Sequence, residues 1–360
     1  MQKAITVVGG KGTRLRPLTN HNPKPLLSVA SSSFVRHQVA KLMDTGVERL
    51  VFATPYLADH FEEEFRGFTQ DLDISYAIEE IALDTGRAIR DAGRLLGGPA
   101  DTPILVLNGD ILSGANLRAF HAHHEANEAD VLHLTREADA SAFGLVPTDG
   151  SGRMLSTLKK PEAREEYVTD HINAGRYVFH QSIAGDQEVY GEQENIPGLA
   201  ADGERVFSHT KDDYGRDLGT PLAFVHWSAD PVTGRATSPL VGPPAATLIH
   251  PTAAIDPSVY VTGGSSIGTH AVIGPHVDVN RSIVGANVSV AEGTQIHESV
   301  VDHGSSIGSE SSLSEAVVGC PSHVGAQNEL PTQLRQSCGI HIPAQGVHVT
   351  TTAAACLTAH

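Results

Sequence analysis

Cysteine is scarce in this sequence, and long hydrophobic runs are absent. Three cysteines in 360 residues cannot form a disulfide framework, so a reducing compartment, the cytoplasm, is the expected location. No apolar stretch is long enough to span a bilayer, and a predicted strand begins almost at the first residue, without the segments of a signal peptide. Cys320, Cys338 and Cys356 are interpreted as small buried residues rather than metal ligands.

Aromatic residues are also few, at 5% of the chain, and the formal net charge is −17 at pH 7. Surfaces that bind nucleic acid combine basic side chains with stacking aromatics, so this composition argues against a nucleic-acid partner. An acidic protein repels polyphosphates in general, and an anionic ligand therefore has to be small and held by a local basic site. The expected partners are small molecules, with neither nucleic acid nor a membrane among them.

Acidic residues are absent from the first 43 positions, where lysine and arginine are frequent. The densest part, Gly9–Pro25 (GGKGTRLRPLTNHNPKP), holds three glycines, three prolines and four cationic side chains. It lacks the third glycine of a G-x-G-x-x-G dinucleotide motif, which is Leu15 here, and it lacks the closing G-K-[ST] of a P-loop. An ordinary flexible turn is one alternative. We favour a glycine-rich loop whose main-chain amides approach phosphate, with charge supplied by Arg14 and Lys24.

The first 229 residues alternate short apolar runs with segments of helical periodicity. This alternation predicts an α/β domain, Rossmann-like, with a mostly parallel sheet and helices on both faces. The expected strands are Ala4–Val8, Arg49–Ala53, Ile74–Ile78, Ile104–Asn108, Asp130–Thr135, Gly144–Thr148 and Asn173–His180. The expected helices are Phe34–Thr45, Leu57–Phe65, Thr85–Leu96 and Asn116–Ala126. Residues 230–247, rich in Pro, Gly, Ser and Thr, are the expected linker.

Residues 248–349 follow a different rule. Aliphatic side chains recur at every sixth position from Ile249, with three steps of five, and small polar residues lie between them. This period predicts a parallel β-helix of about five coils. Its open ends favour self-association, so we expect a homo-oligomer. Histidines at polar positions of the repeat, such as His270, His276 and His297, are interpreted as surface residues, and residues 350–360 as a tail.

The run Gly9-Gly-Lys-Gly-Thr-Arg-Leu-Arg-Pro-Leu-Thr, followed by Pro23-Lys-Pro, resembles the G-G-x-G-T-R-L-x-P-L-T…P-K-P signature of the sugar-phosphate nucleotidylyltransferases. The chain is most similar to the mannose-1-phosphate guanylyltransferases with a C-terminal hexapeptide domain, whose domain order and left-handed β-helix it shares. The resemblance implies nucleotidyl transfer from GTP to mannose 1-phosphate, giving GDP-mannose and pyrophosphate. It implies nucleotide binding by Gly9, Gly10, Lys11, Gly12 and Thr13, with Arg14 and Lys24 as catalytic residues at the phosphates.

A carboxylate follows a predicted apolar strand in the run Leu107-Asn-Gly-Asp110. Open α/β folds bind ligands at the carboxyl edge of the sheet, and an aspartate there can hold Mg²⁺. A turn-capping role for Asp110 is the alternative. Asp217 resembles the family's second metal aspartate, so the resemblance implies Mg²⁺ as the cofactor, held by Asp110 and Asp217.

Further positions resemble the family's substrate contacts. Those expected near the base are Asp84, Thr85 and Gly86. Those expected at the sugar phosphate are Gly144, Lys159, Lys160, Asn173, Gly175 and Glu194. For Glu194 a solvated helix start is the alternative. The family has glutamate at the position of Lys159 and glycine at the position of Asp84. Two roles are open for Asp84: it caps the helix that begins at Thr85, or it accepts hydrogen bonds from the N–H donors of guanine.

Two other functions stay open beside guanylyl transfer to mannose 1-phosphate. A catalytically weak regulatory paralogue would bind a nucleotide sugar as a sensor, and the departures at Asp84, Arg87 and Lys159 favour it. A glucose-1-phosphate nucleotidylyltransferase is the second alternative. Catalysis is favoured because both catalytic cations and both metal carboxylates that the resemblance implies are present.

Overall fold

The computed structural model describes residues 2–54, 58–68, 71–78, 85–114, 116–127, 130–136, 145–156, 158, 169–184, 206–210 and 215–345. The chain divides into two compact units. Unit 1 combines Met1–Gly9 with Gln38–Gly215, and unit 2 combines Gly10–His37 with Arg216–His360. The glycine-rich loop therefore belongs to the same compact unit as the C-terminal repeats, whereas the sequence places it inside an N-terminal domain of residues 1–229.

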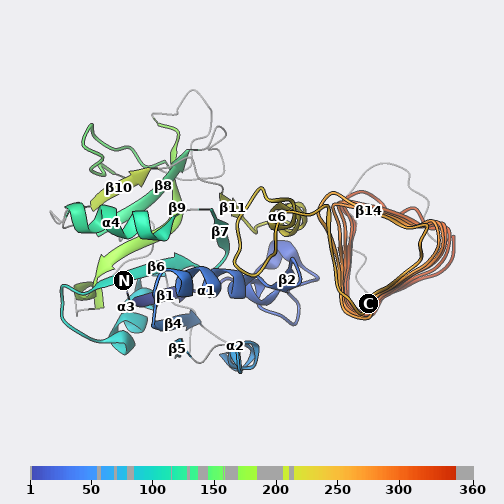
Figure 1. Ribbon diagram of the computed structural model, residues 1–360, viewed down its shortest axis with the longest axis horizontal. Helices are drawn as coiled ribbons and strands as arrows, with labels where there is room; N and C mark the ends of the chain where they lie inside the picture. Colours follow the sequence, from blue (N-terminus) through green and yellow to red (C-terminus); the bar gives the residue numbers. More distant parts are fainter. Residues whose placement is uncertain are drawn as a thin grey trace. The chain divides into compact units, whose positions relative to one another are not determined.

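Unit 1 is built on a seven-stranded sheet in the order β10-β8-β9-β6-β1-β4-β5 (Figure 1). Its strands are β1 (Lys3–Val7), β4 (Arg49–Thr54), β5 (Asp73–Ile78), β6 (Pro103–Asn108), β8 (Asp130–Arg136), β9 (His171–His180) and β10 (Val206–Thr210). Strand β9 runs antiparallel to β6 and β8, and the other neighbouring strands pair in parallel. The sheet is thus mostly parallel, as predicted. Val7 pairs with Asn108, so the carboxyl ends of β1 and β6 lie side by side.

The first helices begin and end within one residue of their predicted bounds. They are α1 (Phe34–Asp44), α2 (Ala58–Phe65), α3 (Thr85–Leu96) and α4 (Leu117–Asn127). Helix α3 buries Ala88, Ala92 and Leu96, which recur at the helical spacing of four and pack against β1, β4 and β5. The expected strand at 144–148 is represented by single bridges of Leu145 and Thr148.

Unit 2 opens with two single 3-10 turns, η1 (Thr13–Leu15) and η2 (Lys24–Leu26), and a hairpin of β2 (Ser28–Val29) and β3 (Ser32–Ser33). The prolines of this segment are incompatible with a longer helix. Helix α6 (Pro221–Thr233) packs against the hairpin: Trp227 is fully buried edge-on to Phe34, and the amide of Ala30 donates to Ser228 Oγ at 2.8 Å. The expected linker of residues 230–247 begins inside this helix, which ends at Gly234 in the left-handed region.

The remainder of unit 2 is a parallel β-helix with three sheets (Figure 1). The first sheet contains β12 (Thr247–Ile249), β15 (Ser265–Ile267), β18 (Ile283–Val284), β21 (Val300–Val301), β24 (Val317–Val318) and β26 (Arg335–Gln336). The second contains β13 (Ala254–Ile255), β16 (Val272–Ile273), β19 (Ser289–Val290), β22 (Ser306–Ile307), β25 (His323–Val324) and β27 (His341–Ile342). The third contains β14 (Tyr260–Thr262), β17 (Asp278–Asn280), β20 (Gln295–His297) and β23 (Ser312–Ser314). This arrangement confirms the predicted fold and is that of a left-handed β-helix.

The coils are joined in register by both apolar and polar side chains. Ile267, Val284 and Val301 pair directly on successive coils, and each is at most 1% exposed. A serine ladder runs beside them, because the amide of Ser299 donates to Ser282 Oγ at 3.1 Å and the amide of Ser282 to Ser265 Oγ at 3.0 Å. The recurrent small polar residues of the repeat therefore satisfy main-chain donors inside the coil stack.

Two interpretations of single residues in the β-helix have different outcomes. His270 and His276 are exposed, as predicted, and both have positive φ angles at corners of the coil. The interpretation of Cys320 and Cys338 as buried residues is wrong: both are half-buried free thiols, because they lie at a corner rather than on the inward face of a strand. Cys356 lies outside the described residues.

None of the helices in the described ranges is long and apolar enough to cross a membrane.

Candidate functional site

The glycine-rich loop leaves the sheet directly after β1. The amide of Val8 still donates to Ala53 O at 2.9 Å, and Gly9 and Gly10 follow. A Cβ atom added at Gly10 would meet nothing within 4 Å, so the main chain there is open to a ligand. Gly12 is different: its φ is +60°, and a Cβ atom would lie 2.9 Å from Thr19 Cγ2. Glycine is therefore required at position 12 by both conformation and space.

Main-chain and side-chain hydrogen bonds hold this loop in one shape. The carbonyl of Gly12 accepts from the amide of Leu15 at 2.9 Å and from Thr19 Oγ1 at 2.8 Å. The two predicted catalytic cations differ in exposure, because Arg14 is exposed whereas only 5% of Lys24 is exposed. Charges interact more strongly where water is excluded, so the environments of the two cations differ electrostatically.

The β-helix contacts this loop within unit 2. Arg335, the first residue of β26, donates through Nη1 to the main-chain carbonyl of Arg14 at 2.5 Å. A Cβ atom added at Gly319 would lie 2.8 Å from Pro17 Cγ, so glycine allows the loop to approach the coil closely. The main chain that carries Arg14 is thus anchored by residues more than 300 positions away.

Asp110 follows a tight turn at the carboxyl end of β6. The amide of Gly109 donates to Val7 O at 2.7 Å, and a Cβ atom added at Gly109 would lie 2.5 Å from Val8 Cγ1. Gln38 Nε2, from α1, donates to Asn108 O at 3.0 Å and to Ile111 O at 2.8 Å, which ties both sides of the turn together. The half-exposed carboxylate of Asp110 is therefore held next to the end of β1.

Two of the predicted sugar-contacting residues lie against this turn. Gly175 in β9 has a φ of +65°, and a Cβ atom added there would lie 2.6 Å from Ile111 Cδ1. Asn173 Oδ1 accepts from the amide of Gly175 at 2.8 Å, and its Nδ2 donates to Tyr177 Oη at 2.8 Å, so the amide group has a defined orientation. The structure thus brings Asn173, Gly175 and the Asp110 turn together in unit 1.

Comparison with known families identifies the architecture. A nucleotidyl transferase model matches residues 3–232, and a GMPPB C-terminal domain model matches residues 244–330. The first match covers more than half of the chain. The chain belongs to the nucleotidyl transferase family.

This nucleotidyl transferase has relatives of known activity. It is 41% identical over 290 residues to the mannose-1-phosphate guanylyltransferase of Mycobacterium tuberculosis, an alignment that covers 78% of this chain and 79% of that protein. It is 32% identical over 232 residues to the mannose-1-phosphate guanylyltransferase catalytic subunit beta of Dictyostelium discoideum, with 62% of each chain covered. The crystal structure of HddC from Yersinia pseudotuberculosis, at 22% identity and a TM-score of 0.53, covers 62% of this chain and 96% of its own, and it shows the shared fold.

Nucleotidyl transferases of this family use a divalent metal ion. Asp110 fits such an ion, because its half-exposed carboxylate offers hard oxygen ligands at the edge where the strands end. It is followed by β7 (Ile111–Ser113), and Asp217 ends β11 (Gly215–Asp217). The side chain of Asp217 is outside what the structure describes, so the pairing of the two aspartates stays a prediction.

Other predicted residues have mixed outcomes. Thr85 and Gly86 form the start of α3, where Gly86 is buried and Thr85 half-buried. The predicted residues that lie outside the described ranges are Asp84, Gly144, Lys159, Lys160 and Glu194.

Sequence reasoning missed the residues that support the site. Gly109 has a local signal, since Asn-Gly is a frequent turn dipeptide. Gln38 and Arg335 have none, because their partners lie 70 and 321 positions away in the chain.

Proposed function

We propose that this chain transfers the guanylyl group of GTP to mannose 1-phosphate. An oxygen of the sugar phosphate attacks the α-phosphorus of GTP, the bond from that phosphorus to the bridging β-oxygen breaks, and pyrophosphate leaves with its electron pair. The products are GDP-mannose and pyrophosphate. The observation that carries this proposal is the glycine loop directly after β1. Its conformation is restrained, its main chain is open at Gly10, and it carries one exposed cation, Arg14, and one buried cation, Lys24.

The loop supplies the phosphate-binding half of the mechanism. Main-chain amides of Gly9, Gly10, Lys11, Gly12 and Thr13 are the proposed donors to the triphosphate. Arg14 presents a planar guanidinium that can hold two oxygens of the leaving pyrophosphate, and buried Lys24 neutralises charge near the α-phosphate. Such chemistry needs positioning and charge neutralisation rather than a covalent intermediate, so no nucleophilic side chain is invoked.

The sugar-binding half of the mechanism is proposed for residues of unit 1. Asn173 offers an oriented amide to sugar hydroxyls, and the absence of a side chain at Gly175 leaves room beside the Asp110 turn. The further contacts carried over from the resemblance are Gly144, Lys159, Lys160 and Glu194. At the base, Asp84, Thr85 and Gly86 are the proposed contacts.

We propose Mg²⁺ as the divalent ion, with Asp110 and Asp217 as its protein ligands. When bound, Mg²⁺ neutralises phosphate charge and orients both substrates. It prefers a few carboxylate oxygens together with phosphate and water, which matches a site with two aspartates beside a triphosphate. We further propose that the protein acts in the cytoplasm as a homo-oligomer associated through its β-helix.

Pyrophosphate release tests the proposal. The purified chain is supplied with Mg²⁺, each of the four nucleoside triphosphates and each of several hexose 1-phosphates. We expect the highest rate with GTP and mannose 1-phosphate, and a loss of roughly 100-fold in Arg14→Ala. Arg16→Ala is the matched control, because Arg16 is an exposed cation of the same loop and has no proposed contact with substrate. Equal rates in the two variants would contradict the role of Arg14.

The same panel separates the alternatives. Binding of GDP-mannose without pyrophosphate release from any pair would identify a sensor, which the lysine at position 159 favours. A preference for glucose 1-phosphate would identify the second alternative. Asp84→Asn tests base selection, since only guanine presents two neighbouring N–H donors to a carboxylate. An unchanged GTP-to-ATP ratio in that variant would remove Asp84 from the base site.

A further inference from the structure

One corner of the β-helix stacks metal-binding residue types on three successive coils. Val301 pairs with Val318, and Val318 pairs with Gln336, so the registers continue past the ends of β21, β24 and β26. Two residues beyond these pairs come His303, Cys320 and Cys338. The three side chains therefore occupy the same position of the repeat, one above the other, at the spacing of neighbouring parallel strands.

Three ligand atoms at this corner are close enough to share one ion, and the fourth, Cys338 Sγ, lies beside one of them. Atoms from Asp302, His303 and Cys320 all lie within 4.8 Å of one another, and His303 Nδ1 is 3.1 Å from Asp302 Oδ1. The Sγ atoms of Cys320 and Cys338 are 3.9 Å apart. Two thiolates on one tetrahedral Zn²⁺, each with a bond of about 2.3 Å, are separated by about 3.8 Å. The thiols are thus spaced as two zinc ligands and are too far apart to be disulfide-bonded.

The donor set points to a particular class of ion. Two sulfurs, an imidazole nitrogen and a carboxylate oxygen suit Zn²⁺, whereas Mg²⁺ requires a shell of oxygens.

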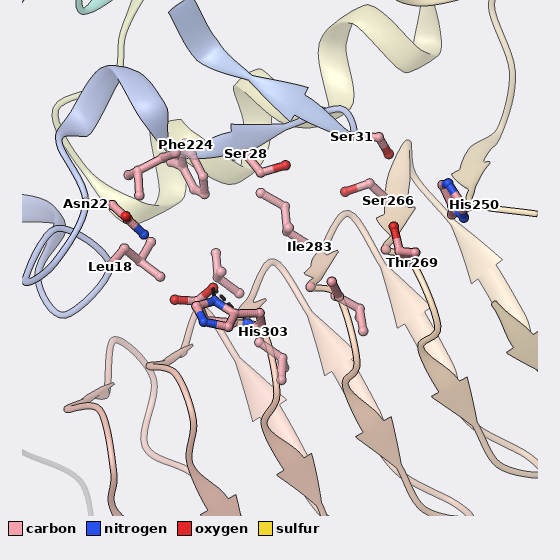
Figure 2. Close-up of a pocket in the computed structure, with 18 of the residues that line it drawn as sticks. Leu18, Asn22, Ser28, Ser31, Phe224, His250, Ser266, Thr269, Ile283 and His303 are labelled. Carbon is pink, nitrogen blue, oxygen red and sulfur yellow. Dashed lines mark hydrogen bonds and ion pairs between the residues drawn. The ribbon is translucent and has the colours of Figure 1, made fainter. Parts of the chain in front are cut away.

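The corner is also accessible from a cavity within unit 2. The cavity has a volume of about 340 Å³, and its lining includes Asp302, His303, Leu18 and Asn22. Figure 2 shows His303 projecting at its edge, opposite the loop that carries Leu18 and Asn22. Two of the four proposed ligands, Asp302 and His303, therefore face a space that water and ions can enter.

We propose that Asp302, His303, Cys320 and Cys338 form a structural Zn²⁺ site that fastens three coils of the β-helix. Binding displaces one proton from each of the two thiols to solvent, and no electron is transferred. Four protein ligands leave no open coordination position, so the ion is structural. This site is separate in its residues and its chemistry from the Mg²⁺ site proposed at Asp110 and Asp217.

Cobalt titration of the full chain tests this site, because Co²⁺ replaces Zn²⁺ and gives a near-ultraviolet charge-transfer band only when thiolates bind it. We expect one thiolate-bound Co²⁺ per chain, displaced by Zn²⁺. Cys320→Ser and Cys338→Ser should each abolish the two-thiolate spectrum. Each should also weaken Zn²⁺ binding by roughly 100-fold or more, because the loss of a group that only hydrogen-bonds to a metal ligand already lowers metal affinity by about 10–100-fold. Asp110→Ala should keep the band, which distinguishes this ion from the one at the proposed active site.

A matched control lies on the same coils. His323 in β25 and His341 in β27 stack with ring centroids 4.7 Å apart, so His323→Gln removes a paired imidazole outside the cluster and should leave the cobalt band unchanged. The proposal is overturned if no thiolate band develops, if Cys320→Ser binds Zn²⁺ as tightly as the natural chain, or if the two thiols are found as a disulfide.

A second measurement avoids variants that fail to fold. In the natural chain, Zn²⁺ should protect Cys320 and Cys338 from alkylation, as read by peptide mapping, and a chelator should restore the reaction. Equal alkylation with and without Zn²⁺ would overturn the site.

Discussion

The β-helix repeats one side-chain environment many times, whereas the α/β sheet places key glycines in environments that differ from one another. In the β-helix, Ile267, Val284 and Val301 repeat one environment coil after coil, and each rung contacts mainly its neighbours. In the sheet, Gly109 and Gly175 each occupy an environment that occurs once, where segments distant in the chain meet. Substitutions in the repeat should therefore change stability, whereas substitutions at the turns of the sheet should change activity.

The largest expected effect is a loss of stability in the middle of the repeat. Ile307 is 2% exposed in β22, and Ile307→Ala should lower the free energy of unfolding by about 2–5 kcal/mol, because it leaves a cavity between coils. Ile249 also lies at a hexad position, at the end of the stack, but it is 40% exposed. Ile249→Ala should therefore lower the free energy of unfolding by no more than about 0.5 kcal/mol. Urea unfolding measures both. Equal losses of unfolding free energy in the two variants would show that the position of a residue along the coil stack does not decide its contribution to stability.

The next largest effect is expected at the turn before Asp110. A Cβ atom at Gly109 would lie 2.7 Å from the main-chain oxygen of Val7, which cannot move without shifting β1. Gly109→Ala should therefore reduce the rate of pyrophosphate release by roughly 100-fold through displacement of Asp110. Gly150→Ala is the control, since nothing lies within 4 Å of its added Cβ atom. Full activity in Gly109→Ala would mean that the turn does not position the carboxylate.

A smaller effect should follow from loosening the glycine loop. Arg335→Ala removes the donor to the carbonyl of Arg14 and should slow pyrophosphate release by about 3–10-fold, as expected for one charge-assisted hydrogen bond near the surface. Stability should change little. Arg281→Ala is the matched control, because Arg281 lies on the same β-helix and donates to Glu298 Oε1 of the next coil at 3.2 Å. Identical kinetics of the two variants would exclude a positioning role for Arg335.

The smallest expected effect is a pH dependence that both regions share. Asp149 in unit 1 and Asp256 in unit 2 each accept from the amide and the hydroxyl of the serine two positions later. These serine hydrogen bonds hold the pKa of both carboxyls below the ordinary value of 3.8. Their contribution to stability is therefore present above the unfolded pKa and is lost as the pH falls through the lower folded pKa.

Ser151→Ala and Ser258→Ala should each weaken this dependence, which is measured by comparing unfolding midpoints between about pH 2 and pH 5. Both variants remove a hydroxyl bond to the aspartate, and Ser258→Ala also removes the acceptor of the His276 amide on the next coil, so its overall stability should fall further. Unchanged pH curves in both would show that these hydrogen bonds do not lower the carboxyl pKa values.

Local sequence patterns predicted most elements well. Helix α3 begins at Thr85 and ends at Leu96 as its periodicity indicated, and the rungs of the β-helix follow the hexad period. The reversed direction of β9 had no signal, since its apolar pattern is that of any buried strand. The half-buried corner positions of Cys320 and Cys338 were also missed, because a period of six identifies inward residues but not which outward residues stack.

The sequence by itself determined the two architectures, the glycine-rich loop and the family, because these depend on short-range periodicity and on a contiguous motif. Only the tertiary structure decided which distant residues support that loop and the Asp110 turn, such as Arg335, Gln38 and Gly175. It also decided that Asp302, His303 and the two thiols share one corner. The physical reason is that contacts across hundreds of positions depend on strand register and close approach, and neither leaves a local pattern in the chain.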